Sequence, residues 1–290
     1  MTMLVTGATG NVGGHVVRAL RTRGVAVRAF VRDPDRAARA LGPDVELAAG
    51  SLPDAVAGVD RVFLACGNVP EQVAFECAAV DAAAAAGVSR VVKLSGPDAS
   101  VDSPLIFERW HGEIERHLAA SGLPRVLLRP RTYMTNLLAY ARTVAETGML
   151  FAPAGTAEIS FVDPRDVGEA AAVCLAGDGH EGQTYTLTGP EAVTYERVAA
   201  ELSAACGRTI TYVNVGDEEA RQAMTAAGLP PMVADAIVAI FAEQRTGTMA
   251  GTTDTLPRLI GREPRTIADF ARDHAGAFGA AALSTGETRT

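Results

Sequence analysis

Glycines spaced for close approach to a phosphate follow the first apolar segment of the chain. Gly7, Gly10 and Gly13 are each separated by two residues in the run TGATGNVGG. Glycines let the backbone turn tightly and approach a pyrophosphate, and a following helix N-terminus offers N–H groups and the positive end of its dipole. Loop geometry alone also produces such runs, but the placement between a predicted strand and a predicted helix favours a cofactor. The residues expected to bind a dinucleotide here are Thr6, Gly7, Thr9, Gly10, Asn11, Val12 and Gly13.

The end of the second predicted strand carries an arginine and an acid, Arg32 and Asp33. An acid at this distance from the glycines can hold the ribose 2′-hydroxyl of NAD, whereas an arginine accommodates the 2′-phosphate of NADP. Asp33 precedes Pro34 and a predicted helix, so it serves equally well as an N-cap. Arg32 comes directly off the strand, with Arg36 as possible support. We therefore predict NADPH as the cofactor, preferred over NAD, with a merely solvated Arg32 as the alternative.

Short apolar runs alternate with segments of helix-forming composition. The predicted strands are Met3–Val5, Val25–Val31, Val45–Leu47, Arg61–Ala65, Arg90–Leu94, Arg125–Leu128, Ile159–Val162 and Thr184–Leu187. Predicted helices include Gly14–Gly24, Pro34–Leu41 and Glu71–Gly87, and the expected C-terminal cap glycines are Gly24, Gly87 and Gly122. The pattern predicts an α/β fold with a doubly wound Rossmann-type parallel sheet, in which at least the first five strands have helices on both faces.

The pattern loosens after Leu128, where a small C-terminal substrate lobe can begin. We expect a helix over Asn136–Thr147, turns over Gly148–Gly155 and a helix start at Asp163-Pro164. Further expected elements are helices at Tyr195–Cys206 and Pro231–Gln244 and a strand at Thr209–Val215. The predicted organisation is a dinucleotide-binding Rossmann core over 1–155, remaining sheet elements plus the small lobe over 156–278, and a mobile tail over 279–290.

Composition argues against several classes of protein. The 290 residues carry a net charge of −8 with no basic patch, which disfavours nucleic-acid binding. The cysteines are widely spaced without a metal-ligand pattern, so no metal is expected; they are Cys66, Cys77, Cys174 and Cys206. No signal peptide and no bilayer-spanning run is recognisable. We expect a cytoplasmic protein, monomer or homodimer, whose partner is a small molecule, aromatic or conjugated, rather than a membrane or a nucleic acid.

Several segments together resemble the NmrA-like, NAD(P)-binding branch of the atypical short-chain dehydrogenase/reductase superfamily. They are TGATGNVGG, VRDPDRA, VVKLSG, WHGEIERHLAASGLPRVLLRP and YTLTGPEAVT, and the resemblance covers nearly the whole chain. It implies a Rossmann core, a small C-terminal lobe over a cleft, and usually a preference for NADPH. It does not imply one reaction, because similar members include quinone and enone reductases as well as redox sensors that bind the dinucleotide without turnover.

The resemblance also implies where a proton donor should lie. Reductases of the wider superfamily commonly use a tyrosine and, four residues later, a lysine that lowers the tyrosine's pKa. In this chain the two positions fall on Phe107 and His111. The only lysine of the chain, Lys93, falls inside the fifth strand and is not available in this register. Ketone reduction with a tyrosine acid is therefore not expected.

Three residues remain as candidates for the chemistry: His111, Ser95 and Tyr133. His111 could donate a proton or orient a substrate, or be a structural histidine beside Trp110. Ser95, at the end of the fifth strand, could contact a carbonyl or quinone, or simply occupy a turn. Tyr133 follows the sixth strand, where it could line the cleft or be a half-buried residue at a loop-to-helix junction.

Several neighbouring residues are further candidates for contact with the cofactor or the substrate. Cys66 and Gly67 follow the fourth strand and should pass under the nicotinamide ribose, where glycine permits close approach. Trp110 could stack on an aromatic substrate or fill the core. Met134 and Asn136 are candidate substrate or cofactor contacts beside Tyr133, whereas Glu113 and Glu115 are expected on a solvated helix face.

Two functions of different classes follow. The first is an NADPH-dependent reductase of a quinone, enone or similar conjugated carbonyl, because conjugation already stabilises the oxygen that gains charge and a few hydrogen-bond donors could replace the missing pair. The rival is a non-catalytic sensor whose NADP-bound form docks onto a partner protein. Epimerase or dehydratase chemistry is disfavoured because it generally needs the tyrosine.

Overall fold

The computed structural model describes residues 1–279, which fall into two compact units. Unit 1 comprises Met1–Tyr133, Val162–Glu191 and Thr252–Pro264, and unit 2 comprises Met134–Phe161, Ala192–Gly251 and the chain from Arg265 onward. Both are discontinuous because the chain returns to unit 1 after residue 161. The boundary thus differs from the single one expected at residue 155, and the tail expected over 279–290 lies, from residue 280, outside the described residues.

Unit 1 is built on a seven-stranded sheet with the order β3-β2-β1-β4-β5-β6-β8, in which every neighbouring pair is parallel. The strands are β1 (Thr2–Val5), β2 (Ala26–Phe30), β3 (Glu46–Ala48), β4 (Arg61–Leu64), β5 (Arg90–Leu94), β6 (Arg125–Pro130) and β8 (Thr184–Leu187). This confirms the predicted doubly wound sheet. The strand order reverses beside β1, and in such sheets a ligand binds in the crevice at the carboxyl ends of the strands flanking the reversal, here β1 and β4.

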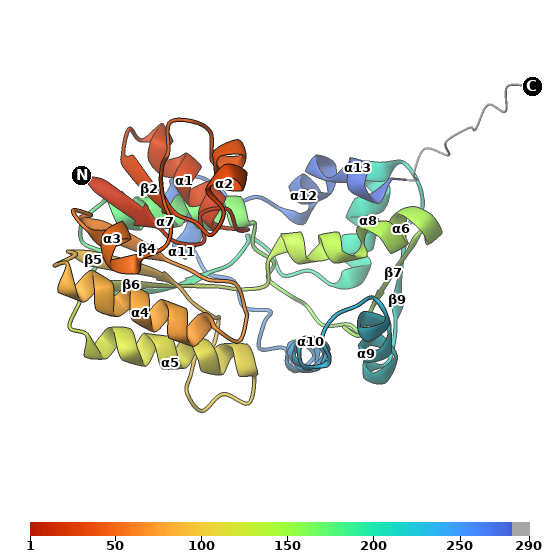
Figure 1. The fold of residues 1–290 in the computed structure, drawn as a ribbon. Helices are drawn as coiled ribbons and strands as arrows, with labels where there is room; N and C mark the ends of the chain where they lie inside the picture. The colour runs from red at the N-terminus through yellow and green to blue at the C-terminus, as the bar shows by residue number, and fades with distance from the viewer. Residues whose placement is uncertain (280–290) are drawn as a thin grey trace, which may run out of the picture. The chain divides into compact units, whose positions relative to one another are not determined.

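Strand residues alternate between two apolar cores, one on each face of the sheet. Met3 and Val5 pack with α1 and α7, whereas Leu4 packs with α4 and α5 on the opposite face (Figure 1). The helices of the first face are α1 (Gly13–Thr22), α2 (Pro34–Leu41), α7 (Pro164–Ala176) and α11 (Thr255–Ile260). Those of the second are α3 (Leu52–Val56), α4 (Gln72–Ala85) and α5 (Ile106–Ala120). A Cβ on Gly168 would lie 2.5 Å from the Cβ of His15, so glycine lets α7 approach α1 closely.

The predicted helix ends of unit 1 are confirmed. Asp163 caps α7 by accepting a hydrogen bond from the Arg165 N–H, and Pro164 follows at the first helical position. Beyond α1, α4 and α5 the chain reverses through left-handed glycines with φ values of 70°, 70° and 75°, at Gly24, Gly87 and Gly122.

Unit 2 contains a two-stranded parallel sheet of β7 (Met149–Ala152) and β9 (Thr211–Asn214). The expectation of turns over Gly148–Gly155 is therefore wrong. Leu150 and Ala152 are buried while Met149 is exposed, but four residues are too few for this alternation to stand out in the sequence. The helices of unit 2 are the 3₁₀ helix η1 (Met134–Tyr140) and α6 (Ala141–Thr147), α8 (Tyr195–Cys206), α9 (Asp217–Ala226), α10 (Pro231–Gln244), α12 (Ile267–Asp273) and α13 (Ala275–Phe278).

The strand predicted at Ile159–Val162 does not form. Ile159 makes an isolated bridge with Val193 in unit 2, and Val162 makes another with Tyr133 in unit 1. The run is apolar because it is buried where the chain passes between the units, and it has no continuous ladder. Among the described residues, no helix has the length and apolar composition needed to cross a membrane.

Candidate functional site

The glycine-rich loop lies at the carboxyl end of β1. Gly7 has a φ of 59°, a left-handed conformation that favours glycine, and the Gly10 N–H donates a 2.8 Å hydrogen bond to the Gly7 carbonyl. The crest of the loop is exposed at Thr9, Gly10 and Asn11, while Ala8 and Val12 point into the core. The loop thus presents backbone to solvent and is anchored from beneath.

Gly13 allows α1 to begin directly against this loop. A Cβ at Gly13 would lie 2.1 Å from the Gly7 carbonyl oxygen, whereas one at Gly14 would meet its nearest atom at 3.5 Å. Within the described residues α1 has no side-chain cap, and its first turn holds no acid. The N–H groups and positive dipole end of α1 therefore suit a phosphate, and the backbone cradle fits the pyrophosphate of a dinucleotide.

Thr6 joins the two strands that flank the crevice. Its buried hydroxyl donates to the Ala65 carbonyl at 2.8 Å and accepts from the Ala65 N–H at 2.8 Å. The side chain therefore fixes the end of β1 to the segment that follows β4. Direct contact between Thr6 and a cofactor stays a prediction.

Arg32 and Asp33 separate into two roles at the end of β2. Asp33 caps α2, accepting a 3.0 Å hydrogen bond from the Arg36 N–H, as the alternative interpretation of this residue holds. Arg32 is exposed, and its charge acts on Cys66 beyond β4. Arg32 therefore lies near the carboxyl edge of the sheet, and its contact with a 2′-phosphate stays a prediction.

Cys66 and Gly67 lie where the sequence places them, directly after β4. Gly67 is exposed and Cys66 is half-buried. Burial, with a contribution from Glu76, raises the pKa of the Cys66 thiol, although Lys93 and Arg32 oppose the shift. The thiol is therefore protonated at neutral pH, which does not suit a nucleophile.

Ser95 is buried and engaged in a polar network at the end of β5. Its hydroxyl donates a 2.6 Å hydrogen bond to Glu115, whose carboxylate also accepts from Arg129 at 2.5 and 3.1 Å. The Ser95 proton is directed at Glu115 in this arrangement. The expectation of a solvated Glu115 is wrong, because only 12% of its side chain is exposed once it pairs with Arg129.

The contacts of Lys93 differ from the expectation that this lysine is unavailable to the site. Its backbone lies in β5 as predicted. Its side chain extends to α5, where Nζ lies 3.1 Å from His111 Nδ1. Nζ also lies 2.7 Å from Glu76 Oε2, and both side chains are completely buried. The lysine expected to be unavailable is therefore in contact with His111. Phe107, at the other position, is half-buried against Trp110, with ring centroids 5.5 Å apart.

Tyr133 is the last residue of the first segment of unit 1, and Met134 is the first residue of unit 2. Tyr133 packs against the core of the sheet, and burial raises the pKa of its hydroxyl above the ordinary value. Met134 is 1% exposed in the core of unit 2, so packing accounts for its side chain, whereas Asn136 is exposed. Tyr133 as a participant in the chemistry stays a prediction.

Glu108 is a buried carboxyl that the sequence pattern does not reveal. It accepts a 3.0 Å hydrogen bond from the Asp98 N–H, and its carboxylate fills the space over Gly96. Burial raises the pKa of Glu108 to about 7, with the Asp98 charge adding to the effect and the Asp98 N–H, Arg129 and Arg131 opposing it.

The Glu108 carboxyl should make the stability of the protein fall with rising pH. A folded-state pKa near 7, above the ordinary 4.5, gives stabilisation that is complete below about pH 4.5 and lost as pH rises through 7. Denaturant titrations at pH 5 and pH 8 should show Glu108→Gln removing about 3 kcal/mol of this pH dependence. Glu113→Gln, on the same helix, controls for the change in charge. An identical pH dependence in wild type and Glu108→Gln would contradict the assignment.

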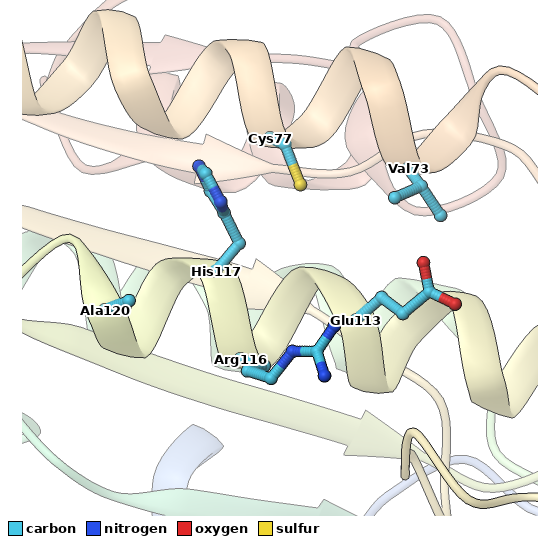
Figure 2. A pocket seen from close by; sticks show the side chains of 6 residues that line it. All are labelled: Val73, Cys77, Glu113, Arg116, His117 and Ala120. Atoms are coloured by element: carbon cyan, nitrogen blue, oxygen red, sulfur yellow. The ribbon is translucent and has the colours of Figure 1, made fainter.

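A separate shallow groove of about 390 Å³ lies between α4 and α5. Figure 2 shows its lining, which consists of Val73 and Cys77 from α4 and Glu113, Arg116, His117 and Ala120 from α5. His117 Nε2 lies 2.7 Å from Asp81 Oδ1 and links the two helices. None of the predicted cofactor or catalytic residues lines this groove.

Sequence reasoning misses Gln72, Glu76 and Glu108. Gln72 and Glu76 carry a usable signal, because they lie four residues apart on one face of an alanine-rich helix in which Asp81 is the other charged residue. A single lysine within an apolar strand is the matching signal from β5. Buried polar groups need partners, so the two signals together could have predicted a pair.

Comparisons with known proteins show relatives that match nearly the whole chain. The chain is 41% identical over 285 residues to an NAD(P)H azoreductase of Xenophilus azovorans, covering 96% of this chain and all of the relative. It is 39% identical to a (4-alkanoyl-5-oxo-2,5-dihydrofuran-3-yl)methyl phosphate reductase of Streptomyces griseus, covering 95% and 99% of the two chains.

A solved structure shows the same fold. The NADPH-dependent quinone oxidoreductase of Escherichia coli in complex with NADPH superposes with a TM-score of 0.85 and 30% identity, over 93% of this chain and 99% of that one. The model of the NmrA-like family matches residues 1–267. The glycine-rich loop, the strand order and this match over most of the chain agree, and the protein belongs to the NmrA-like family.

Proposed function

We propose that the protein is an NADPH-dependent reductase of quinones, enones or similar conjugated carbonyl compounds. The observation that carries the proposal is the cradle formed by Gly7, Gly10 and Gly13, which brings the uncapped N-terminus of α1 to the crevice beside β1 and β4. Two relatives that match nearly the whole chain are reductases, and one of them is an NAD(P)H azoreductase. Their named substrates, an azo compound and a dihydrofuran with conjugated carbonyls, support a conjugated substrate here.

Conjugation makes the absence of the tyrosine tolerable. NADPH, when bound, supplies a hydride to an electron-poor atom of the substrate. The electron pair then moves onto an oxygen whose charge the conjugated system already disperses, and solvent water can supply the proton to that oxygen afterwards. The protein must therefore hold the substrate in the reactive geometry and stabilise the negative charge that develops on it. A directed hydrogen bond suffices for the second task. His111 is the residue we assign to that hydrogen bond.

Turnover tests the proposal directly. Purified protein with NADPH and a panel of a benzoquinone, a cyclic enone, an azo dye and a saturated ketone should oxidise NADPH with the first three only, followed by its near-ultraviolet absorbance. Loss of NADPH with the saturated ketone alone would overturn the substrate class. Absence of turnover with every compound, together with calorimetric discrimination between NADP⁺ and NADPH, would instead support a dinucleotide sensor.

Cofactor choice should depend on Arg32. Loss of a charged hydrogen bond to a 2′-phosphate costs roughly 1.5–3 kcal/mol, so Arg32→Ala should raise the Kd for NADPH about 10- to 100-fold. The Kd for NADH should change little, because NADH lacks the 2′-phosphate. Arg39→Ala removes another exposed arginine, from the last turn of α2, and serves as the matched control. Equal weakening of both cofactors by Arg32→Ala would count against a role for Arg32 in selecting NADPH.

A further inference from the structure

The completely buried ammonium group of Lys93 has partners on three sides. Lys93 Nζ donates to the Leu94 carbonyl at 2.5 Å and lies 3.1 Å from His111 Nδ1. Glu76 Oε2, at 2.7 Å, neutralises the charge as an ion pair, without the alignment of a hydrogen bond. In this ion pair the lysine is an ammonium group, and an ammonium can only donate.

His111 Nδ1 therefore faces donors alone. Besides the ammonium, the Gln72 amide nitrogen lies 3.4 Å from Nδ1 while also donating to Glu76 Oε1 at 3.1 Å. A ring nitrogen that faces two donors must present its lone pair, so the imidazole proton lies on Nε2. Gln72 and Glu76 share one face of α4, and they hold the network from the side opposite β5.

The surroundings also keep the ring neutral. Burial, the Lys93 charge and the Arg129 charge together lower the pKa of His111 well below its ordinary value. The charged groups that act on the ring come from β5 and β6, and Glu76 on α4 is engaged by Lys93. At neutral pH His111 is thus a neutral imidazole and cannot serve as an imidazolium acid.

Nε2 is the ring nitrogen that remains to donate a hydrogen bond to a ligand. No described residue accepts a hydrogen bond from Nε2, and the buried polar atoms of this network without a hydrogen-bond partner are Gln72 Oε1 and Glu76 Oε2. Lys93 precedes the last residue of β5, so the network lies toward the carboxyl edge of the sheet, where open α/β sheets bind their ligands.

We propose that Lys93 is a positioning residue that locks His111 as a neutral Nε2–H donor, aimed at the substrate oxygen or nitrogen that gains charge on reduction. The tautomer follows from the network alone, whereas its use in turnover rests on the proposed function. A neutral donor suits this task, because it stabilises the developing anion throughout the working pH range without having to exchange its own proton.

The tautomer is measured without any turnover. Long-range ¹H–¹⁵N spectra of uniformly labelled protein distinguish Nε2–H, Nδ1–H and imidazolium rings, and His111→Gln identifies the signal among the five histidines. We expect the Nε2–H pattern for His111, unchanged between pH 6 and pH 8. An Nδ1–H pattern, or titration of His111 within this range, would overturn the proposal.

Lys93→Met should release the lock, giving a mixture of tautomers or a ring that titrates. Because the single change leaves Glu76 unpaired, Lys93→Met with Glu76→Gln provides a second variant in which no carboxylate is stranded. A His111 spectrum unchanged in both variants would show that Lys93 does not set the tautomer.

Kinetics test the use of the donor. His111→Leu should lower kcat about 10- to 100-fold with the Kd for NADPH unchanged, while His111→Gln, whose amide can donate from a similar position, should recover part of the loss. The Lys93 variants should lower kcat in the same sense. Equal activity of His111→Leu and wild type would overturn the role in turnover. If wild type turns over no substrate, the proposed function fails while the spectra still decide the tautomer.

Discussion

Alanine in place of Gly13 should weaken NADPH binding by at least about 10-fold, because one or more charged hydrogen bonds to the phosphates, each worth about 1.5–3 kcal/mol, are lost. The added Cβ would lie 2.1 Å from the Gly7 carbonyl oxygen and 2.7 Å from its carbon. Both atoms belong to backbone, so no side chain can rotate away, and α1 must move off the loop. Isothermal titration with NADPH measures the effect.

Gly14→Ala is the matched control for this substitution. It adds the same methyl group one residue later, where the nearest atom, the Ala8 carbonyl oxygen, is at an ordinary 3.5 Å. Binding should stay within about threefold of wild type, since a surface substitution away from a strained site changes the free energy by only a few tenths of a kcal/mol. Wild-type affinity in Gly13→Ala would refute the cradle as the pyrophosphate site.

Breaking the Lys93–Glu76 pair from one side should cost about 3–5 kcal/mol of folding stability, a large share of the total for a domain of this size. Both side chains are completely buried, so Lys93→Met leaves a carboxylate, and Glu76→Gln an ammonium, without its counter-charge. Chemical denaturation at neutral pH measures the loss in each single variant.

Combining the two substitutions should return most of that stability. The double variant leaves no charge at these two positions, and the Gln72 amide still finds an oxygen at position 76 to accept its hydrogen bond. Such non-additivity is the signature of a direct pair. Losses that simply add in the double variant would mean that the two residues stabilise the fold independently.

The sequence predicts the sheet of unit 1 well because its signals are local. Each strand is an apolar run, some helices begin at a capping side chain, as at Asp33 and Asp163, and the glycine loop lies between a strand and a helix. It predicts unit 2 less well. The strand β7 is four residues long, and the apolar segment at Ile159–Val162 is buried without forming a ladder.

The cofactor side of the site is more predictable than the catalytic side for a related reason. A phosphate cradle is a continuous stretch of backbone, so the glycines in one loop report it. The Lys93–His111 contact instead joins β5 to α5, eighteen residues apart, and its partner Glu76 comes from α4. Only the fold brings these three side chains together. The position of Lys93 in the sequence therefore does not reveal its contact with His111.

The interleaving of the two units has a consequence for how this protein can diversify. The chain passes between unit 1 and unit 2 five times, so neither unit corresponds to one uninterrupted stretch of coding sequence. A cut after Tyr133 would remove β8 and also α7, which is the helix that packs against α1. Exchange of one continuous segment therefore cannot replace unit 2 without also replacing parts of unit 1.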